Sequence, residues 1–415
     1  MTSDILAIDF GTSNSAAAII ENNRPRRLTI EGGEDTLPTA VFFPTKKPGM
    51  QIGMAAASAL ITGQDGRYLR ALKSVLGNPL LHESRMLGGK RRPLADIVSA
   101  FLAEVKQRAE QLTGQQYNRA LSGRPVRFHS ADATRDAKAE DDLRACYLAA
   151  GFKDVAFMYE PEAAALANHT SEDDGQLGLI VDIGGGTSDF SVFRSEQGKL
   201  SILASHGIRL GGTNFDQAIS VSHVMPHLGM GGELRREFGR GLQPIPKAIF
   251  TDLATWAKIP FLYNHETRRM VAEMVKLAVT PTQLERLETV LEIELGHQLA
   301  FAVERGKIAA NSGETDAQID MSLIEQGLSA AIDETSLNEA LLRYRSDLKC
   351  AAEETLKLAG VELTAINSVV LVGGSSLMRM ITSEMAALCP EAQLKQAEAF
   401  TAVVDGLALA TPSAF

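Results

Sequence analysis

The sequence predicts a two-lobed α/β protein, and three observations support that prediction. A hydrophobic strand ending in aspartate, a glycine bend and a second strand occur in LAIDFGTSNSAAAII and again in LGLIVDIGGGTSDFSVF. Asp9 and Asp182 are equivalent in the two copies, which are therefore offset by 182 − 9 = 173 residues. The length of 415 residues exceeds the roughly 250–300 residues at which a single core stops growing. Strand and helix patterns also alternate along the chain, as in α/β folds.

The first half of the chain alternates strand and helix patterns. Apolar side chains recur every three or four residues over 94–113, and Gly114 follows as a residue that readily ends a helix. Pro161 suits a first helical position, so we expect an alanine-rich helix after Glu160. The polar segment 170–176 is expected to cross between the lobes. The other expected elements are strands over 4–10, 15–20, 39–43 and 155–159 and a helix over 137–150 ended by Gly151.

Helical patterns dominate the second half, after a strand over 199–205 and a turn over 210–216. Residues 217 to about 330 are expected to be mostly helical, with a glycine- and proline-rich interruption over 226–246. Thr280-Pro281 is expected to begin one long amphipathic helix that runs to about Ala310. The last expected elements are a helix over 337–359 that stops at Gly360, and a buried strand, glycine turn and helix in SVVLVGGSSLMRMITSEMAALCP.

The composition narrows the possible classes of protein and of binding partner. With 45% apolar and 22% charged residues, the chain resembles an ordinary soluble protein. The net charge of −10, from 41 basic and 51 acidic residues, argues against a nucleic-acid partner. Three cysteines without metal-ligand spacing favour a reduced, cytoplasmic protein without disulfides. No apolar run reaches membrane-spanning length and no signal-peptide pattern is visible, so we expect a cytoplasmic protein with no membrane partner.

Each of the two glycine bends is suited to bind phosphate. Glycine lets backbone N–H groups approach phosphate oxygens, and an aspartate at the strand end is a hard oxygen ligand for Mg²⁺ held through water. Simple turn capping explains one such motif equally well, but two in register favour a phosphate site. The bend residues are Gly11, Thr12, Ser13 and Asn14 in the first copy and Gly184, Gly185, Gly186 and Thr187 in the second.

Three further features are weak signals of a phosphate site on their own and support it only together with the two bends. The turn at Gly373, Gly374 and Ser375 precedes a helix, where unpaired N–H groups attract polar ligands, although it could be an ordinary strand-to-helix turn. Glu160 lies at the end of an expected strand and just before an expected helix, where it could position water or merely stabilise the helix. Lys73 taken alone is one lysine among many.

Together these motifs resemble the nucleotide-binding domain of DnaK-type heat-shock chaperones. DFGTSNS and DIGGGTSDFSVF are similar to the two phosphate motifs of that family, LVGGSS to its adenosine motif, and LGGTNFD to its LGGxDFD turn. EPEAAALA and AVVDGLALA are similar to its two connecting helices. AGFKDVAFMYEP and MPHLGMGGE resemble the YegD-like branch. The resemblance covers nearly the whole chain and implies an actin-like ATPase fold, with duplicated ribonuclease H-like domains and inserted subdomains.

The resemblance also implies a domain organisation. Residues 1–171 would form lobe I, with an inserted subdomain over about 28–93. Residues 172–394 would form lobe II, with an insertion over about 213–331. The segment 395–415 would return to lobe I. Because only nine residues follow Gly406, we expect no peptide-binding domain of the kind that full chaperones carry.

ATP or ADP and Mg²⁺ are the ligands that the resemblance implies. Lys73 matches the lysine that contacts the transferring phosphate, and Glu160 the carboxylate linked to the attacking water. Thr187 matches the hydroxyl near the γ-phosphate. Asp182 matches part of the acidic shell around the metal and completes the candidate catalytic set of Lys73, Glu160, Asp182 and Thr187. The implied reaction is in-line attack of water on the γ-phosphate.

Other residues match the family's metal-binding and nucleotide-binding positions. The candidate metal shell is Asp9, Asp182 and Asp189. The candidate nucleotide contacts are Gly11, Thr12, Ser13, Asn14, Gly184, Gly185, Gly186, Thr187, Gly211, Gly212, Glu304, Lys307, Ile308, Gly373, Gly374, Ser375 and Leu377.

The sequence departs from the family at three places. Ile308 and Leu377 stand where the family sandwiches adenine between two arginines, so cation stacking is lost and weaker binding is expected. Asn214 replaces the first aspartate of the LGGxDFD turn. The connecting segment VRFHSADA lacks the proline that the family uses for signalling between domains.

The leading hypothesis is an ATP-binding, weakly hydrolysing, chaperone-like protein whose lobes close on nucleotide and whose partners include protein clients or co-regulators. An actin-like filament protein shares the duplicated hairpins. A small-molecule kinase of the same superfamily is disfavoured by Lys73 and Glu160 at the hydrolysis positions. A nucleotide-gated interaction module without catalysis also stays open.

Overall fold

The computed structural model describes residues 4–46, 49–129, 132–168, 175–196, 199–237, 239–396 and 401–415. The chain forms two compact units. Unit 1 contains Met1–Gly212 and Arg345–Phe415, and unit 2 contains Thr213–Tyr344. Most of the expected crossing segment 170–176 lies outside the described residues.

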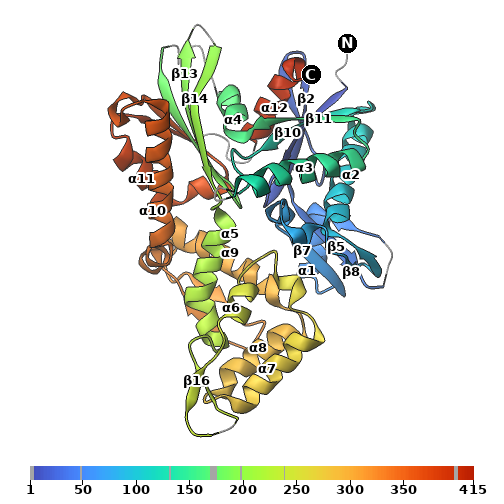
Figure 1. The fold of residues 1–415 in the computed structure, drawn as a ribbon, viewed down its shortest axis with the longest axis vertical. Helices are drawn as coiled ribbons and strands as arrows, with labels where there is room; N and C mark the ends of the chain where they lie inside the picture. Colours follow the sequence, from blue (N-terminus) through green and yellow to red (C-terminus); the bar gives the residue numbers. More distant parts are fainter. Residues whose placement is uncertain are drawn as a thin grey trace. The chain divides into compact units, whose positions relative to one another are not determined.

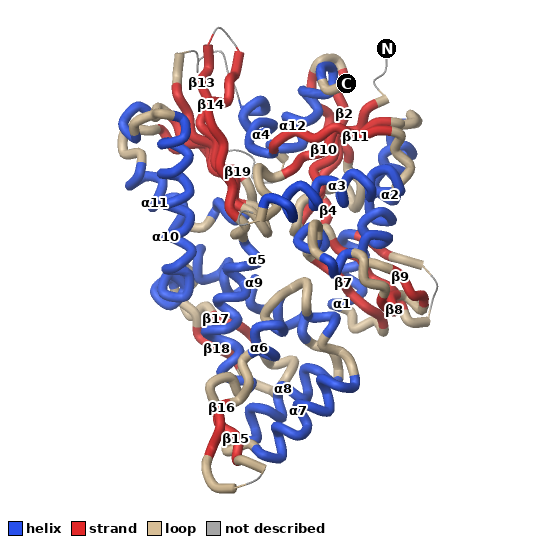
Figure 2. The backbone as a smooth tube through the Cα atoms, viewed as in Figure 1, coloured by secondary structure: helices blue, strands red, loops and turns tan. Residues whose placement is uncertain are grey.

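Unit 1 contains two sheets built on the same plan (Figures 1 and 2). The first consists of β1 (Ile5–Phe10), β2 (Asn14–Glu21), β3 (Arg24–Leu28), β4 (Leu37–Pro38), β10 (Arg119–Arg124) and β11 (Asp154–Tyr159). The second consists of β12 (Leu177–Ile183), β13 (Ser188–Glu196), β14 (Lys199–Ile208), β19 (Ser368–Val372) and β20 (Gln393–Gln396). The strand order is β11-β10-β1-β2-β3 in the first sheet and β20-β19-β12-β13-β14 in the second.

The repeat in the sequence is therefore also a repeat in topology. Strand β1 runs antiparallel to β2 and parallel to β10. Strand β12 has the same relation to β13 and β19. Because both copies place a hydrophobic, doubly flanked strand at the centre of a sheet, both central strands are almost entirely buried.

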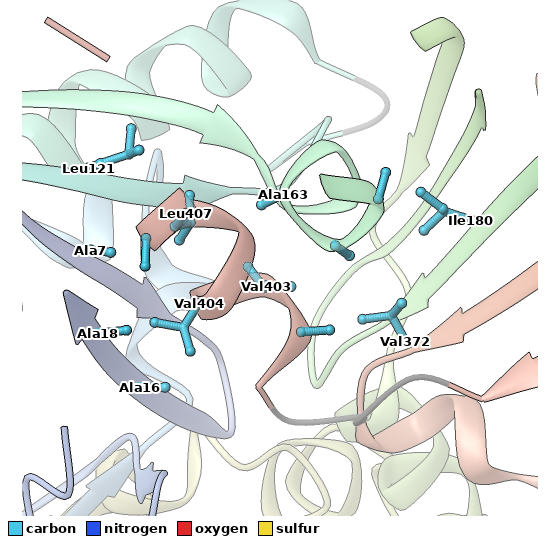
Figure 3. Packing of buried hydrophobic residues seen from close by; sticks show 14 of the residues in the cluster. Ala7, Ala16, Ala18, Leu121, Ala163, Ile180, Val372, Val403, Val404 and Leu407 are labelled. Carbon is cyan, nitrogen blue, oxygen red and sulfur yellow. The ribbon is translucent and has the colours of Figure 1, made fainter. Parts of the chain in front are cut away.

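Two helices, α4 (Glu160–Asn168) and α12 (Ala402–Ala410), share one apolar core with both sheets. Figure 3 shows Val403 and Leu407 of α12 on the side of Ala163 of α4, and Val404 on the side of Ala16 and Ala18 of β2. The helices approach so closely that a Cβ on Gly406 would lie 1.7 Å from the carbonyl oxygen of Ala163. Small side chains make this contact possible, which explains the alanine-rich composition of both segments.

The rest of unit 1 surrounds these sheets. A small sheet contains β5 (Ala40–Pro44), β6 (Gln51–Ile52) and β7 (Gly66–Arg70), which pack with α1 (Gly53–Ile61), and β8 (Arg85–Leu87) pairs with β9 (Lys90–Arg92). The larger helices are α2 (Leu94–Thr113), α3 (Ala133–Ala149) and α11 (Arg379–Leu388), together with the part of α10 (Glu334–Ala359) from Arg345 onward.

Most of the expected elements of unit 1 are confirmed. Helix α2 has the predicted bounds, and Gly114 ends it with a left-handed φ of 68°. Helix α3 begins four residues before the expected 137, because the carboxylate of Asp132 accepts a 3.0 Å hydrogen bond from the N–H of Arg135 and caps it. Helix α4 begins at Glu160, so Pro161 is its second residue rather than its first.

Unit 2 is mostly helical, as expected. It contains two hairpins, β15 (Glu233–Arg235) with β16 (Leu242–Pro244) and β17 (Gln318–Asp320) with β18 (Ser329–Ala331). Its helices include α5 (Gly212–Ile219), α6 (Ala248–Leu253), α7 (His265–Leu277), α8 (Pro281–Glu292) and α9 (Gly296–Ser312). The segment 210–216 was expected as a turn, but α5 already begins at Gly212.

The expected single helix from Thr280 to Ala310 is wrong, because the chain breaks it into α8 and α9. Glu294 adopts a left-handed φ of 57° at the break. Directly after it, the N–H of Gly296 donates a 3.0 Å hydrogen bond to the hydroxyl of Tyr263. A Cβ on Gly296 would lie 2.7 Å from Ile259 and 2.8 Å from that hydroxyl. Packing against another segment therefore decides the break, and an amphipathic period does not reveal it.

Substituting Gly406 tests the contact between α12 and α4. Gly406→Ala places a methyl group against the backbone of Ala163, and we expect overpacking to lower the free energy of unfolding by about 1–3 kcal/mol. Urea unfolding followed by circular dichroism measures this change. Ser413→Ala, at an exposed position just beyond α12, is the control and should change stability by less than about 0.5 kcal/mol. Equal stability of the two variants would contradict the contact.

Candidate active site

The acidic residues of the site occupy equivalent places at the ends of two central strands. Asp9 is the penultimate residue of β1 and lies opposite Ala16 of β2. Asp182 is the penultimate residue of β12 and lies opposite Asp189 of β13. Asp182 and Asp189 are buried, whereas Asp9 is partly buried. Asp182 is also paired with Val372 of β19, whereas the pairing of β1 with β10 ends at Ile8. Each of these aspartates therefore has its backbone within a sheet and not in a loop.

The two glycine bends that follow these strands are in direct contact. A Cβ on Gly185 would lie 2.3 Å from the hydroxyl oxygen of Ser13, and one on Gly186 would lie 2.8 Å from that of Thr12. Within the first bend, a Cβ on Gly11 would lie 2.2 Å from the carbonyl oxygen of Asn14. A Cβ at any of these positions would require a neighbouring atom to shift, so the backbone of the second bend lies directly against the hydroxyl side chains of the first.

Two more glycine turns pack against the second bend. The N–H of Gly212 donates a 3.0 Å hydrogen bond to the carbonyl of Gly184, and a Cβ on Gly211 would lie 2.6 Å from the backbone nitrogen of Gly186. Gly373 has a φ of 81°, and a Cβ there would lie 2.7 Å from a carboxylate oxygen of Asp182. Gly374 and Ser375 continue from it in a short 3₁₀ turn, and a Cβ on Gly212 would lie 2.4 Å from the hydroxyl oxygen of Ser375.

Lys73 and Glu160 form a buried ion pair beside the bends. The Nζ atom of Lys73 lies 2.6 Å from Oε1 of Glu160, and both side chains are buried. Lys73 lies in a 3₁₀ turn that follows Ala71, whose φ of 60° turns the chain sharply. Burial disfavours the charged ammonium, but Glu160 and Asp9 outweigh it and raise the pKa of Lys73.

The remaining carboxylates of the site have elevated pKa values. Burial, together with the charge of Glu160, raises the pKa of Asp9 to about 7 and that of Asp189 to about 8. Burial and the neighbouring carboxylates also raise the pKa of Asp182 well above its usual range. A hydrogen bond of 2.6 Å from the N–H of Val126 opposes the rise at Asp189. Four carboxyl groups thus lie near Lys73, and burial and their mutual repulsion oppose the ionisation of all four.

This donor set fits a hydrated divalent cation. Asp9, Asp182 and Asp189 supply the hard oxygen ligands that Mg²⁺ prefers, and added positive charge would relieve their mutual repulsion. Across the described ranges, no three His, Cys, Asp or Glu side chains are grouped so that they could hold a metal ion together. A Mg²⁺ ion at this place would therefore take ligands from water and phosphate, as Mg²⁺ commonly does.

The residues matched to the base and ribose have different surroundings. Glu304, Lys307 and Ile308 lie on α9 of unit 2. Lys307 is buried, and its Nζ lies 2.7 Å from Oδ1 of Asp216, whose other oxygen accepts a 3.0 Å hydrogen bond from the indole of Trp256. Lys307 thus makes a structural ion pair within unit 2. The side chain of Ile308 is 57% exposed.

Leu377 ends the 3₁₀ turn of unit 1 that begins at Gly374. It is 41% exposed. An apolar side chain on a surface turn can pack against a base, but it offers no cation to the face of an aromatic ring.

Sequence reasoning missed three residues near the site. The N–H of Val126 donates a hydrogen bond to Asp189, and the guanidinium of Arg209 contacts His129 at 2.6 Å.

The proline that was expected to be missing from the connecting segment lies just before residues 126–133. Strand β10 ends at Arg124 and Pro125 follows it directly, so the connection does contain a proline. The sequence GRPV, at the end of a buried strand, is the signal that could have revealed it.

Comparisons with known proteins find similarity to one group of chaperones. The family model described as Hsp70 protein matches residues 83–229. The chaperone protein DnaK of Halobacterium salinarum is 26% identical over 410 residues, which cover 98% of this chain and 55% of the relative. DnaK of Metamycoplasma hominis is 32% identical over 220 residues, which cover 52% of this chain and 34% of the relative. The chain spans about half the length, or less, of these curated relatives.

The repeated sheets and the family match define an α/β protein of the actin-like ATPase fold, so the fold class expected from the sequence is confirmed. Within that class, the chain is similar to the nucleotide-binding domain of Hsp70 and DnaK-type chaperones. In the parts of the chain that the structure describes, every helix is too short or too polar to cross a membrane.

The raised pKa values predict how pH affects the ligand-free protein. A carboxyl group whose pKa is higher in the folded than in the unfolded state binds its proton more tightly when folded, so stability is lost as pH rises through that window. For Asp189 the window extends from about 3.8 to about 8. We expect the free energy of unfolding to fall between pH 5 and pH 8.5, and Asp189→Asn to recover on the order of 1–3 kcal/mol at the upper end.

Guanidinium chloride unfolding at several pH values, without nucleotide or metal, measures this dependence. Asp141→Asn removes an exposed carboxylate of α3 and is the matched control. If the pH dependence of the Asp189 variant equals that of the parent and of the control, the acidic cluster does not titrate in this window.

Proposed function

We propose that the protein binds Mg²⁺–ATP between its two glycine bends and hydrolyses it slowly, as a chaperone-like ATPase. The observation that carries the proposal is the direct contact of the two bends beside a buried Lys73–Glu160 pair. Backbone N–H groups of the bends would face the phosphates, and the acidic strand ends would face the metal. The similarity to DnaK over 98% of the chain supports the same function.

In this proposal the bends bind the triphosphate from opposite sides. Thr12 and Ser13 of the first bend, with Gly185 and Gly186 of the second, supply the donors that hold the phosphate chain. Gly211, Gly212 and the turn from Gly373 to Ser375 pack against the second bend, where the nucleoside end would follow. A Mg²⁺ ion bound here neutralises charge that develops on the phosphate oxygens.

The reaction would be attack of water on the γ-phosphate. A bond forms between the water oxygen and the γ-phosphorus, while the bond to the bridging oxygen breaks and its electron pair leaves with ADP. In this proposal Glu160 would orient the water and accept its proton, and the ammonium of Lys73 would stabilise charge on the γ-phosphate. Their separation of 2.6 Å lets one residue hold the other in position.

The output of the cycle would be a change in the angle between the two halves of unit 1. Helices α4 and α12 form the core between the two sheets, and Glu160 is the first residue of α4. A nucleotide that contacts both bends would favour one relative orientation of the sheets, as ligands do in hinged proteins. Protein clients or co-regulators would sense that change. We assign the protein to the YegD-like branch on the segments AGFKDVAFMYEP and MPHLGMGGE.

Titration of the purified protein with ATP, ADP and GTP in the presence of Mg²⁺, followed by calorimetry and by phosphate release, tests this function. We expect ATP and ADP to bind and ATP to be hydrolysed slowly. Absence of heat with every nucleotide would contradict the proposal, whereas tight binding without phosphate release would leave a nucleotide-gated interaction module.

Lys73→Ala should reduce hydrolysis far more than binding. We expect the rate of ATP cleavage to fall by about 10²–10³-fold, because a preorganised positive charge at the transition state is lost. The Kd for ATP should change by less than about tenfold. Lys90→Ala, which removes an exposed lysine of β9, is the control and should leave both quantities unchanged. Equal turnover of the Lys73 variant and the parent would remove the role assigned to Lys73.

Leu377→Arg should strengthen binding of adenine nucleotides. A guanidinium over the base is expected to add about 0.5–1 kcal/mol, which is a two- to fivefold decrease in the Kd for ATP. Leu377→Gln, a polar side chain without charge, is the matched control. Calorimetry with both variants measures the effect, and identical affinities would place the base away from Leu377.

A further inference from the structure

A small cavity lies beside Lys73 on one side of the proposed phosphate site. Its volume is about 20 Å³, which is room for about one water molecule. One wall is formed by Lys73, Thr12 and Thr187, the residues that the proposed function places around the γ-phosphate. The lining also includes His129 and Arg209, which that function does not use.

Arg209 bridges segments that belong to the two repeated halves of unit 1. It follows β14 of the second sheet directly. Its Nη1 lies 2.6 Å from Nδ1 of His129, which follows β10 of the first sheet. Its Nη2 donates a 2.6 Å hydrogen bond to the carbonyl of Ser74, the residue next to Lys73. The guanidinium therefore joins both halves at the cavity, and Arg209 is itself exposed to solvent.

The hydrogen bond between Arg209 and His129 requires the neutral tautomer of His129 whose proton is on Nε2. Nε2 lies 2.7 Å from the carbonyl oxygen of Leu76, so Nε2 carries the proton and donates it there. Nδ1 is then free of a proton and accepts the hydrogen bond from Arg209. Burial, opposed by the Leu76 carbonyl and assisted by Arg209, lowers the pKa of His129 and so favours this neutral form. The imidazole is thus a fixed acceptor for the guanidinium.

We propose that Arg209 is a gate through which inorganic phosphate leaves after ATP is cleaved. This inference rests on the proposed function. While ADP still occupies the site, the cleaved phosphate has to leave from its γ end, and the cavity beside Lys73 adjoins that end. A phosphate ion is larger than the cavity, so Arg209 must move away from His129 and Ser74 first. A guanidinium that loses these partners can bind the departing phosphate through paired N–H groups.

Two rates measured in single turnovers test the gate. Acid quenching reports cleavage of ATP, and a fluorescent phosphate-binding protein reports release of phosphate. In the parent, release should lag behind cleavage. In Arg209→Ala, we expect release to become at least about fivefold faster while cleavage changes less than twofold. Arg209→Lys, which can make only one of the two contacts, should give an intermediate release rate.

Arg127→Ala is the matched control, because it removes an exposed arginine two residues before His129. It should leave both rates unchanged. An unchanged release rate in the Arg209 variants would overturn the gate. A parallel fall of cleavage and release would overturn it as well, since Arg209 would then act on the chemical step.

A readout without ATP cleavage separates failure of the gate from failure of the proposed function. The parent and Arg209→Ala are saturated with Mg²⁺–ADP, and inorganic phosphate is added as the probe in stopped-flow and calorimetric measurements. We expect phosphate to dissociate at least about fivefold faster from the variant. If the parent cleaves no ATP, the ATPase proposal fails and these measurements alone decide the gate. Equal phosphate dissociation from both proteins, or no phosphate binding to the parent, would refute it.

Discussion

The close approach of two glycine bends is the constraint on which the rest of the structure depends. Backbone atoms at Gly185 and Gly186 lie so near the hydroxyls of Ser13 and Thr12 that any Cβ would collide. This approach brings the acidic ends of β1 and β12 into one site. It also explains why each bend needs glycine although the flanking strands are rich in bulky apolar residues.

The acidic ends of β1 and β12 place several carboxylates close together in a buried region, where they repel one another. Asp9, Asp182 and Asp189 share their surroundings with Glu160 and with the ammonium of Lys73. The raised pKa values of the aspartates express the cost of placing like charges in a buried region. The backbone of each aspartate is held within a sheet despite this repulsion, and such a site favours a ligand that brings positive charge.

The two repeated halves of unit 1 are connected at two places. The shared core of α4 and α12 lies between the repeated sheets, and the ion pair of Glu160 with Lys73 extends from the start of α4 into the site. Arg209 makes a second, polar connection between the halves at the site's edge. The apolar core is compatible with small changes in angle, whereas the guanidinium contacts are either made or broken. These two kinds of connection are what the hinge and the gate proposed above would require.

The sequence by itself determined the features that depend on local pattern: the repeated strand–bend–strand units, the bounds of α2 and the acidic and glycine residues of the bends. Tertiary structure decided the features that depend on contacts between distant segments. Packing of Gly296 against Tyr263 broke the long helix, Asp216 paired with Lys307, and Arg209 reached His129 from another sheet. Hydrophobic periodicity and glycine spacing record the backbone path of a segment, but they carry no information about which remote side chain will meet it.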